Sequence, residues 1–148
     1  MNRNKINSET KTLQWLLDQQ QEKTANCLKL SNATQERMIE AEKHLQILSL
    51  KQKQLKERQG NATVGGDIAN IFKYCSVVSE SMHECEAEIA RIDEELKARK
   101  IELDHSIKKG FSLEKLIEKK CLNRKVLEVK LEQKEIDEFA CIQHSKKR

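Results

Sequence analysis

The sequence contains no proline and only four glycines among its 148 residues. Three of the glycines fall within residues 60–66 (GNATVGG), so little else would interrupt a helix on either side. Aromatic residues make up 3% of the chain, which leaves too few large side chains for a compact globular core. No apolar run approaches the ~20 residues of a membrane-spanning helix, so no such helix is expected.

Charged residues are abundant, at 35% of the chain, and the mean hydropathy is −0.76. This composition is typical of a disordered chain, or of two long helices that bury one narrow stripe. The spacing of the apolar residues decides between these two classes, and it favours helices.

Steps that alternate between four and three residues define a heptad pattern before the glycines. Eight of its fourteen positions are apolar and three are Ser or Thr. We call these positions the first seam: Leu13, Leu17, Gln20, Thr24, Cys27, Ser31, Thr34, Met38, Ala41, Leu45, Leu48, Gln52, Leu55 and Gln59. The polar positions between Gln20 and Thr34 predict loose packing there. Residues 1–7 are expected to fray, with Asn7 or Ser8 capping the helix.

The same stepping gives a stronger pattern after the glycines, because its first eight positions are all apolar. We call it the second seam: Ile71, Cys75, Val78, Met82, Cys85, Ile89, Ile92 and Leu96, continuing through Leu103, Leu113, Ile117, Leu127 and Leu131. Asp67 is the expected helix cap. Gly110 is expected to sit within an unbroken helix, the alternative being a kink after which Ser112 caps a new helix.

These patterns predict an all-α fold, a long antiparallel two-helix coiled coil, forming a single domain over residues 1–148. Helix 1 is expected at about 8–59, the turn at 60–66 and helix 2 at about 67–143. Helix 2 would then overhang helix 1 by about 25 residues at 1.5 Å each, from near Cys121 onward. Its apolar residues there would have no intramolecular partner, which predicts a partner-binding element: Leu127, Leu131, Ile136 and Phe139.

The charge distribution supports antiparallel pairing. Lys and Arg outnumber Asp and Glu by 11 to 7 in residues 1–66, and by 9 to 5 in residues 119–148. In residues 67–118 the ratio is 8 to 12, so the first helix and the middle segment carry opposite net charge. The last segment is basic without an internal complement, which predicts an acidic partner.

Nothing in the sequence indicates catalysis or a cofactor. The five cysteines form no CxxC pair and suit free thiols in a reducing cytoplasm, and no His or Cys spacing predicts a metal site. There is no phosphate-binding loop and no nucleophile–base grouping. Residues 61–63 match a glycosylation acceptor, a match expected to be accidental.

Residues 131–140 (LEQKEIDEFA), followed by a basic tail, resemble the C-terminal signature of the FliJ family, stalk proteins of the flagellar type III export apparatus. Residues 41–48 and 70–82 match the same family pattern. The resemblance implies a cytoplasmic monomer, peripherally associated with the inner membrane, whose end bearing both termini inserts into the hexameric export ATPase. It also implies contact with the cytoplasmic domain of the membrane export gate, binding of export chaperones, and a role in motility, but no nucleic-acid binding and no membrane insertion.

The resemblance also implies two sets of contact residues. The ATPase-ring contact would comprise Leu131, Gln133, Lys134, Asp137, Glu138 and Phe139. The export-gate contact would comprise His44, Leu48, Leu55, Tyr74, Val78, Ser81 and Cys85. Lys51, Leu55 and Cys85 depart from the residue types common in the family.

Each of these residues also has a structural interpretation. For Phe139 a partner anchor is favoured over a terminal staple. Val78 is better explained by packing, Tyr74 is open between gate contact and packing, and His44 fits a residue that covers the groove. Two other functions stay open: the equivalent stalk of a virulence-type III secretion injectisome, and a generic scaffold or nucleic-acid-binding coiled coil.

Overall fold

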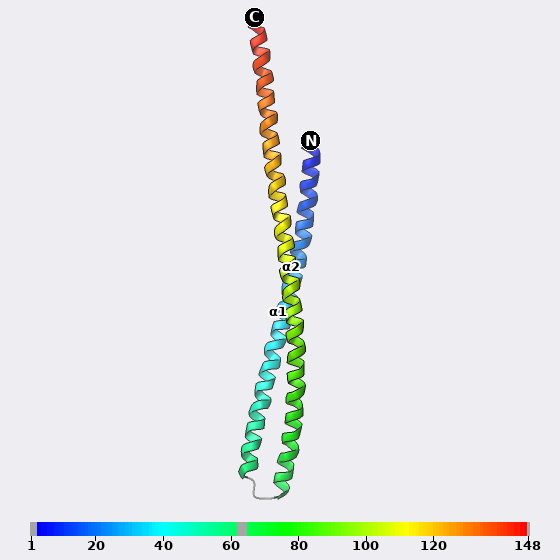
Figure 1. Ribbon diagram of the computed structural model, residues 1–148, viewed down its shortest axis with the longest axis vertical. Coiled ribbons are helices and arrows are strands. Elements are labelled where there is room, and N and C mark those ends of the chain that lie inside the picture. The colour runs from blue at the N-terminus through cyan, green and yellow to red at the C-terminus, as the bar shows by residue number, and fades with distance from the viewer. Residues whose placement is uncertain (1–2, 62–64, 148) are drawn as a thin grey trace. The chain divides into compact units, whose positions relative to one another are not determined.

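A computed structural model describes residues 3–61 and 65–147 of the chain, with the side chain of residue 3 left out. The described residues form two helices, α1 (Arg3–Asn61) and α2 (Gly65–Lys146), and contain no strand (Figure 1). The predicted fold class is confirmed: the chain is an all-α antiparallel helix pair, with 82 residues in α2 and 59 in α1.

The chain divides into two compact units, each containing a part of both helices. Unit 1 comprises Met1–Ala25 and His105–Arg148, and unit 2 comprises Asn26–Asp104. The prediction of a single domain over residues 1–148 stays a prediction.

Contacts between α1 and α2 establish the antiparallel register within each unit. In unit 1, Lys120 donates a hydrogen bond to Glu9 at 3.0 Å, and Gln20 donates one to Ser106. The corresponding contacts in unit 2 are Arg37 to Glu95 and Gln52 to Ser79. In both units a higher residue number on α1 pairs with a lower number on α2, as required for antiparallel helices (Figure 1).

The first seam is confirmed in full. All fourteen of its positions are buried or half-buried, and every other residue from 11 to 61 is exposed. On α2, every position of the second seam from Ile71 to Leu127 is likewise at least partly buried. Leu131 is the exception, because it is exposed and does not belong to the packed stripe.

The expected loose packing between Gln20 and Thr34 is met only in part. Gln20, Ser31 and Thr34 are buried, whereas Thr24 and Cys27 are half-buried. Short side chains allow close approach of the helices, and hydrogen bonds satisfy the polar atoms, as when Thr34 donates to the carbonyl of Leu30 at 2.9 Å. No buried side-chain nitrogen or oxygen of the described residues lacks a hydrogen-bond partner.

The helix ends also differ from the predictions. α1 begins at Arg3, and Ile6 is only 4% exposed, so the segment expected to fray contributes to the core. Asn7 and Ser8 therefore lie inside the helix and do not cap it. Gly60 and Asn61 belong to the end of α1, and Gly65 and Gly66 to the start of α2. Four of the seven residues predicted to form the turn are therefore helical. The rest of that turn, residues 62–64, lies outside the described residues.

α2 runs through Gly110 without a break, as expected. Ser112 does not cap a new helix, because its hydroxyl donates back to the carbonyl of Lys108 at 3.0 Å, one turn earlier in the same helix. Asp67 is likewise no cap, since it lies in the first turn of α2, where its negative charge interacts favourably with the helix dipole.

Candidate functional site

The last part of α2 has no packing partner among the described residues. Every residue from 129 to 147 is exposed, and we call this stretch the exposed segment. Its large apolar side chains are strongly accessible, with Phe139 63% exposed. The other apolar members are Val129, Leu131, Ile136 and Ile142. Such a concentration of exposed apolar side chains is typical of a partner-binding surface.

The six residues predicted to contact an ATPase ring all lie in the exposed segment. Gln133 donates a hydrogen bond to Asp137 at 3.0 Å, one turn further along the helix. Phe139 and Leu131 present apolar surface, while Lys134 and Glu138 are accessible for charge pairing. The structure therefore brings the whole predicted set onto one accessible stretch of helix.

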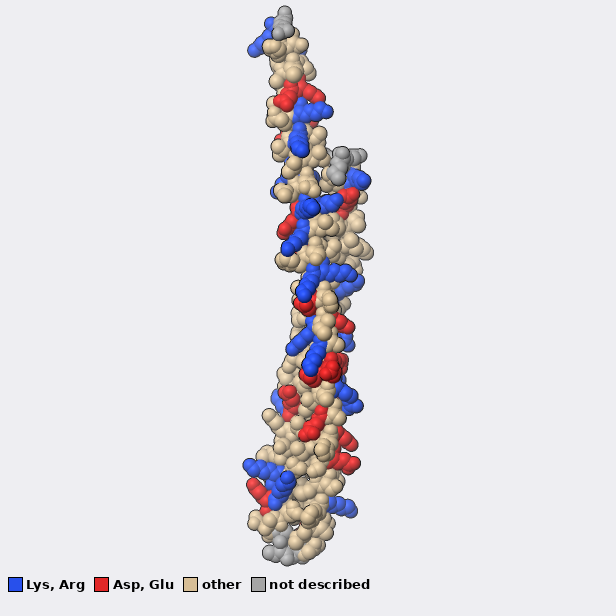
Figure 2. All heavy atoms as spheres, viewed as in Figure 1, with Lys and Arg blue, Asp and Glu red and all other residues tan. Residues whose placement is uncertain are grey.

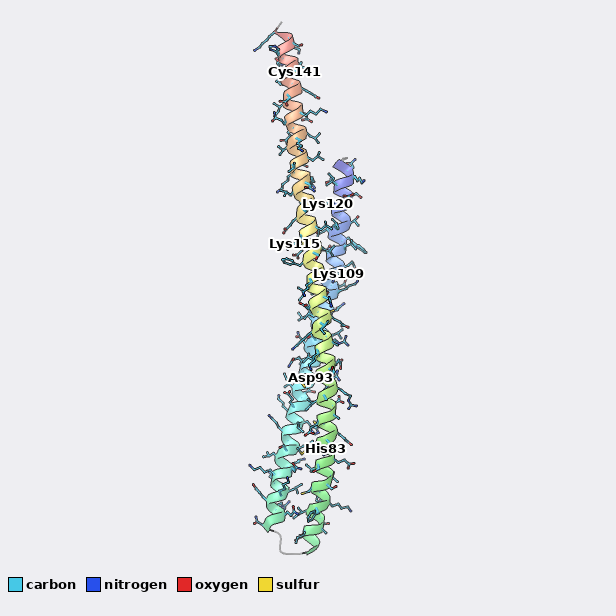
Figure 3. All side chains as sticks on the ribbon, viewed as in Figure 1. His83, Asp93, Lys109, Lys115, Lys120 and Cys141 are labelled. Atoms are coloured by element: carbon cyan, nitrogen blue, oxygen red, sulfur yellow. The ribbon has the colours of Figure 1, made fainter. Side chains whose placement is uncertain are left out.

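The exposed segment begins later than predicted. Ile6 packs beside Leu127, with which it lines a small cavity, and Leu127 is half-buried. Lys120, labelled in Figure 3, reaches α1 through its bond to Glu9, whereas Cys141 lies in the stretch beyond. The extra residues at the start of α1 thus cover the part of α2 that was expected to be unpaired from Cys121.

The charge of the exposed segment is balanced. It contains four Lys and four acidic residues, so its net charge is zero. The basic excess lies earlier, where Lys120 pairs with Glu9, and where Arg124 pairs with Glu128 at 3.3 Å. The expectation of a basic end without an internal complement is therefore not met in this stretch. On the face seen in Figure 2, Lys and Arg groups lie next to Asp and Glu groups at several places, with uncharged surface between these clusters.

The seven residues predicted to contact an export gate all lie in unit 2, but they differ in accessibility. His44 and Tyr74 are exposed, and Leu55, Val78 and Ser81 are half-buried. Leu48 and Cys85 are buried in the helix interface, where the Cys85 thiol donates to the carbonyl of Ala41 at 3.4 Å. A partner could touch Tyr74 directly, whereas Cys85 is engaged in packing.

Tyr74, Leu55 and Val78 share a groove between the helices of unit 2. One cavity of about 480 Å³ includes Leu55, Arg58 and Tyr74 in its lining. A second, of about 290 Å³, has these three residues together with Val78. Because the two cavities share three lining residues, we treat them as one feature and call it the unit 2 groove.

Arg58 and Lys51 of the unit 2 groove were missed as candidate site residues. The available signal was their seven-residue spacing, which places both on the same helix face as Leu55 between them. In the sequence alone, Lys51 and Arg58 do not stand out as a pair, because Lys53 and Lys56 lie between them.

Among the described residues, no group of three or more His, Cys, Asp or Glu side chains could hold a metal ion. Within the same residues, no helix is long and apolar enough to cross a membrane. Asp93 accepts a hydrogen bond from Lys97 and, with Glu94, raises the pKa of that lysine. This is opposite in direction to the lowered pKa of lysines that act as bases or nucleophiles.

Comparison with protein families gave a match over residues 10–148 to the family described as flagellar FliJ protein. The match includes the exposed segment and the unit 2 groove. Comparisons with curated proteins and with solved structures gave no match.

Proposed function

Because this chain belongs to the flagellar FliJ protein family, we propose that it is the stalk of the flagellar export apparatus. Family membership makes it a component of that apparatus, a type III secretion system that exports protein during flagellum biogenesis. A stalk acts by binding other proteins and carries out no reaction of its own.

The proposed stalk inserts the exposed segment into the hexameric export ATPase. The observation that carries this role is the continuous exposure of residues 129–147, which leaves side chains such as Phe139 and Ile136 without an intramolecular partner. Inside a ring these side chains would be removed from water, and each large side chain can contribute about 1.5–3 kcal/mol when fully buried. Phe139 is the proposed anchor, since large aromatic side chains are enriched among interface hot spots.

The second proposed contact is with the cytoplasmic domain of the membrane export gate. It uses the accessible members of the predicted set, above all Tyr74, with Leu55 and Val78 beside it in the unit 2 groove. Leu48 and Cys85 would support this surface from within the helix interface.

The proposal places the protein in the cytoplasm, at the inner membrane, as a monomer that also binds export chaperones. Family membership favours the flagellar stalk over the equivalent stalk of an injectisome. No observation favours a general scaffold or a nucleic-acid-binding coiled coil, because the exposed segment has no net positive charge with which to bind phosphates.

The experiment measures the rate of ATP hydrolysis by the cognate export ATPase while increasing amounts of the full chain, or of a chain that ends before Leu131, are added. The truncated chain should keep the melting temperature of the full chain, because residues 131–147 are all exposed. It should lose stimulation of the ATPase.

Phe139→Ala in the full chain should raise the concentration needed for half-maximal stimulation by more than about tenfold, as expected for a hot spot. Phe72→Ala is the matched control, because Phe72 is an equally exposed phenylalanine in unit 2. Undiminished stimulation by the truncated chain would contradict insertion of the exposed segment into the ring.

A further inference from the structure

The packing between α1 and α2 in unit 2 is incomplete toward the last residues of α1 and the first residues of α2. Leu48 and Cys85 are buried, but no described residue between them is. The seam residues of this stretch, such as Leu55 and Ile71, are only half-buried. The helices therefore leave apolar surface accessible between them, where a third element could complete the packing.

The unit 2 groove is the hollow that this incomplete packing leaves. Its floor includes Leu55 and Val78, and Tyr74 stands at its side with 64% of its surface exposed. A tyrosine in this position offers a large apolar face and a hydroxyl group, a combination enriched in protein interfaces.

Two cations line the groove on the α1 side. Lys51 and Arg58 both line the cavity that contains Val78, and that cavity has no carboxylate in its lining, whereas Asp67 lines the other cavity of the groove together with Arg58. Neither cation forms an ion pair with another described residue, whereas Arg37 in the same unit pairs with Glu88 and Glu95. The groove thus combines apolar residues with two cations and one carboxylate, so its lining carries a net positive charge.

We propose that the unit 2 groove binds an acidic amphipathic segment of the export gate, a proposal that rests on the gate contact proposed above. The apolar side chains of the segment lie on Leu55, Tyr74 and Val78, and its carboxylates face Lys51 and Arg58. The two cations are two helical turns apart, about 10 Å along α1. A peptide with two acidic residues can reach both, whereas one lipid headgroup reaches only one of them.

The test compares two double charge reversals in the full chain. The first is Lys51→Glu with Arg58→Glu, which changes the groove. The second is Lys53→Glu with Lys56→Glu, which makes the same change of charge in the same part of α1 at exposed residues that do not line the groove. All four positions are exposed, so both variants should fold, as a circular dichroism melt would verify.

The measurement is the affinity for the purified cytoplasmic domain of the cognate gate, by calorimetry at about 0.05 M and about 0.3 M salt. The groove reversal should weaken binding by about tenfold or more and remove most of its salt dependence. The control reversal should stay within about threefold of the wild type. Tyr74→Ala should weaken binding without changing the salt dependence.

The outcomes separate the two proposals. If the wild-type chain does not bind the gate domain, the gate contact fails and the groove proposal fails with it. If it binds, but the two reversals weaken binding equally, the groove proposal alone is wrong. Binding to phosphatidylglycerol vesicles that only the groove reversal abolishes, with gate binding intact, would assign the groove to lipid and also overturn the proposal.

Discussion

A partly buried ring of hydrogen bonds joins α1 and α2 in unit 1, and its contribution to stability can be predicted. The Gln20 side-chain amide donates to the Ser106 hydroxyl at 2.8 Å, and the Thr24 hydroxyl donates to the backbone carbonyl of Gln20 at 2.9 Å. Thr24 has a single hydroxyl proton, so the 2.6 Å contact between the Thr24 and Ser106 hydroxyls must be donated by Ser106. The three residues therefore close a ring between α1 and α2.

Ser106→Ala removes two bonds of this ring. Each neutral hydrogen bond contributes about 0.5–1.5 kcal/mol net, so the loss of two should lower the free energy of unfolding by about 1–3 kcal/mol. Gln20 would keep its 3.2 Å bond to the Ser106 carbonyl, and Thr24 would keep its bond to Gln20, so no donor is left without an acceptor. For a chain of about 150 residues each kcal/mol shifts the melting temperature by roughly 2–4 °C, so the melting temperature should fall by roughly 2–12 °C.

Ser112→Ala is the matched control. Ser112 is exposed, on the same helix, and bonds only within its own turn, to the Lys108 carbonyl. The change from Ser to Ala has the same helix-propensity effect at both sites, and it favours Ala. The difference between the two variants in urea unfolding, followed by circular dichroism, therefore measures the ring. If Ser106→Ala is as stable as Ser112→Ala, the ring does not contribute to stability.

Removal of all the polar groups of the ring should behave differently. Gln20→Leu, Thr24→Val and Ser106→Ala together leave no polar side chain without a partner, so the triple variant should lose less stability than the sum of the three single variants. A simple sum would mean that the three side chains contribute independently, contrary to the geometry of a closed ring.

Two further changes test the packing of α2. Ile92→Asp places a carboxylate at a position only 3% exposed and should lower the free energy of unfolding by more than about 3 kcal/mol. The control Ile101→Asp, at an exposed position, should lower it little. Equal melting temperatures for the two variants would mean that the register of α2 is wrong. Gly110→Ala should stabilise unit 1 by about 0.5–1 kcal/mol, because Gly110 lies within a helix. The new methyl group would lie 3.8 Å from the Gln20 side chain, an ordinary van der Waals contact. A loss of stability in urea unfolding would show that the helices cannot accept the methyl group.

Heptad spacing predicted the fold well because burial in an antiparallel helix pair depends mainly on residue position. Thr24 and Gln52 are at least partly buried although both are polar, since their positions on α1 face α2. The same spacing could not reveal that Gln20 and Ser106 bond to each other. That contact depends on the register between two segments 86 residues apart, which neither segment specifies alone.

The helix ends were less predictable, because they depend on contacts between distant residues. Asn7 and Ser8 have the side chains of good helix caps. The helix nevertheless continues to Arg3, where burial of Ile6 beside Leu127 offers apolar contact that a frayed end would lose. Gly60 and Gly65 likewise predicted a turn from the sequence. Their backbone freedom also permits the helical conformation found there.

The residues of the candidate site were predicted from the sequence, but the ion pairs formed by the basic residues that precede it were not. The basic excess near the end of the sequence suggested an acidic partner, but Lys120 and Arg124 have their partners within unit 1. What the exposed segment offers a partner is therefore apolar surface, with Val129, Phe139 and Ile136 most accessible.

The helical state of the exposed segment depends on the rest of α2. Without the rest of α2, the exposed segment would have to nucleate its own first turn, an unfavourable step, before hydrogen bonds could accumulate. In α2 that nucleus already exists, since residues up to Leu127 are held by packing against α1, and the exposed segment only extends a formed helix. The extension leaves Phe139 and its apolar neighbours ordered but uncovered, so a partner that buries them has little backbone entropy left to overcome. The packed part of unit 1 thereby prepares the surface that the proposed function uses.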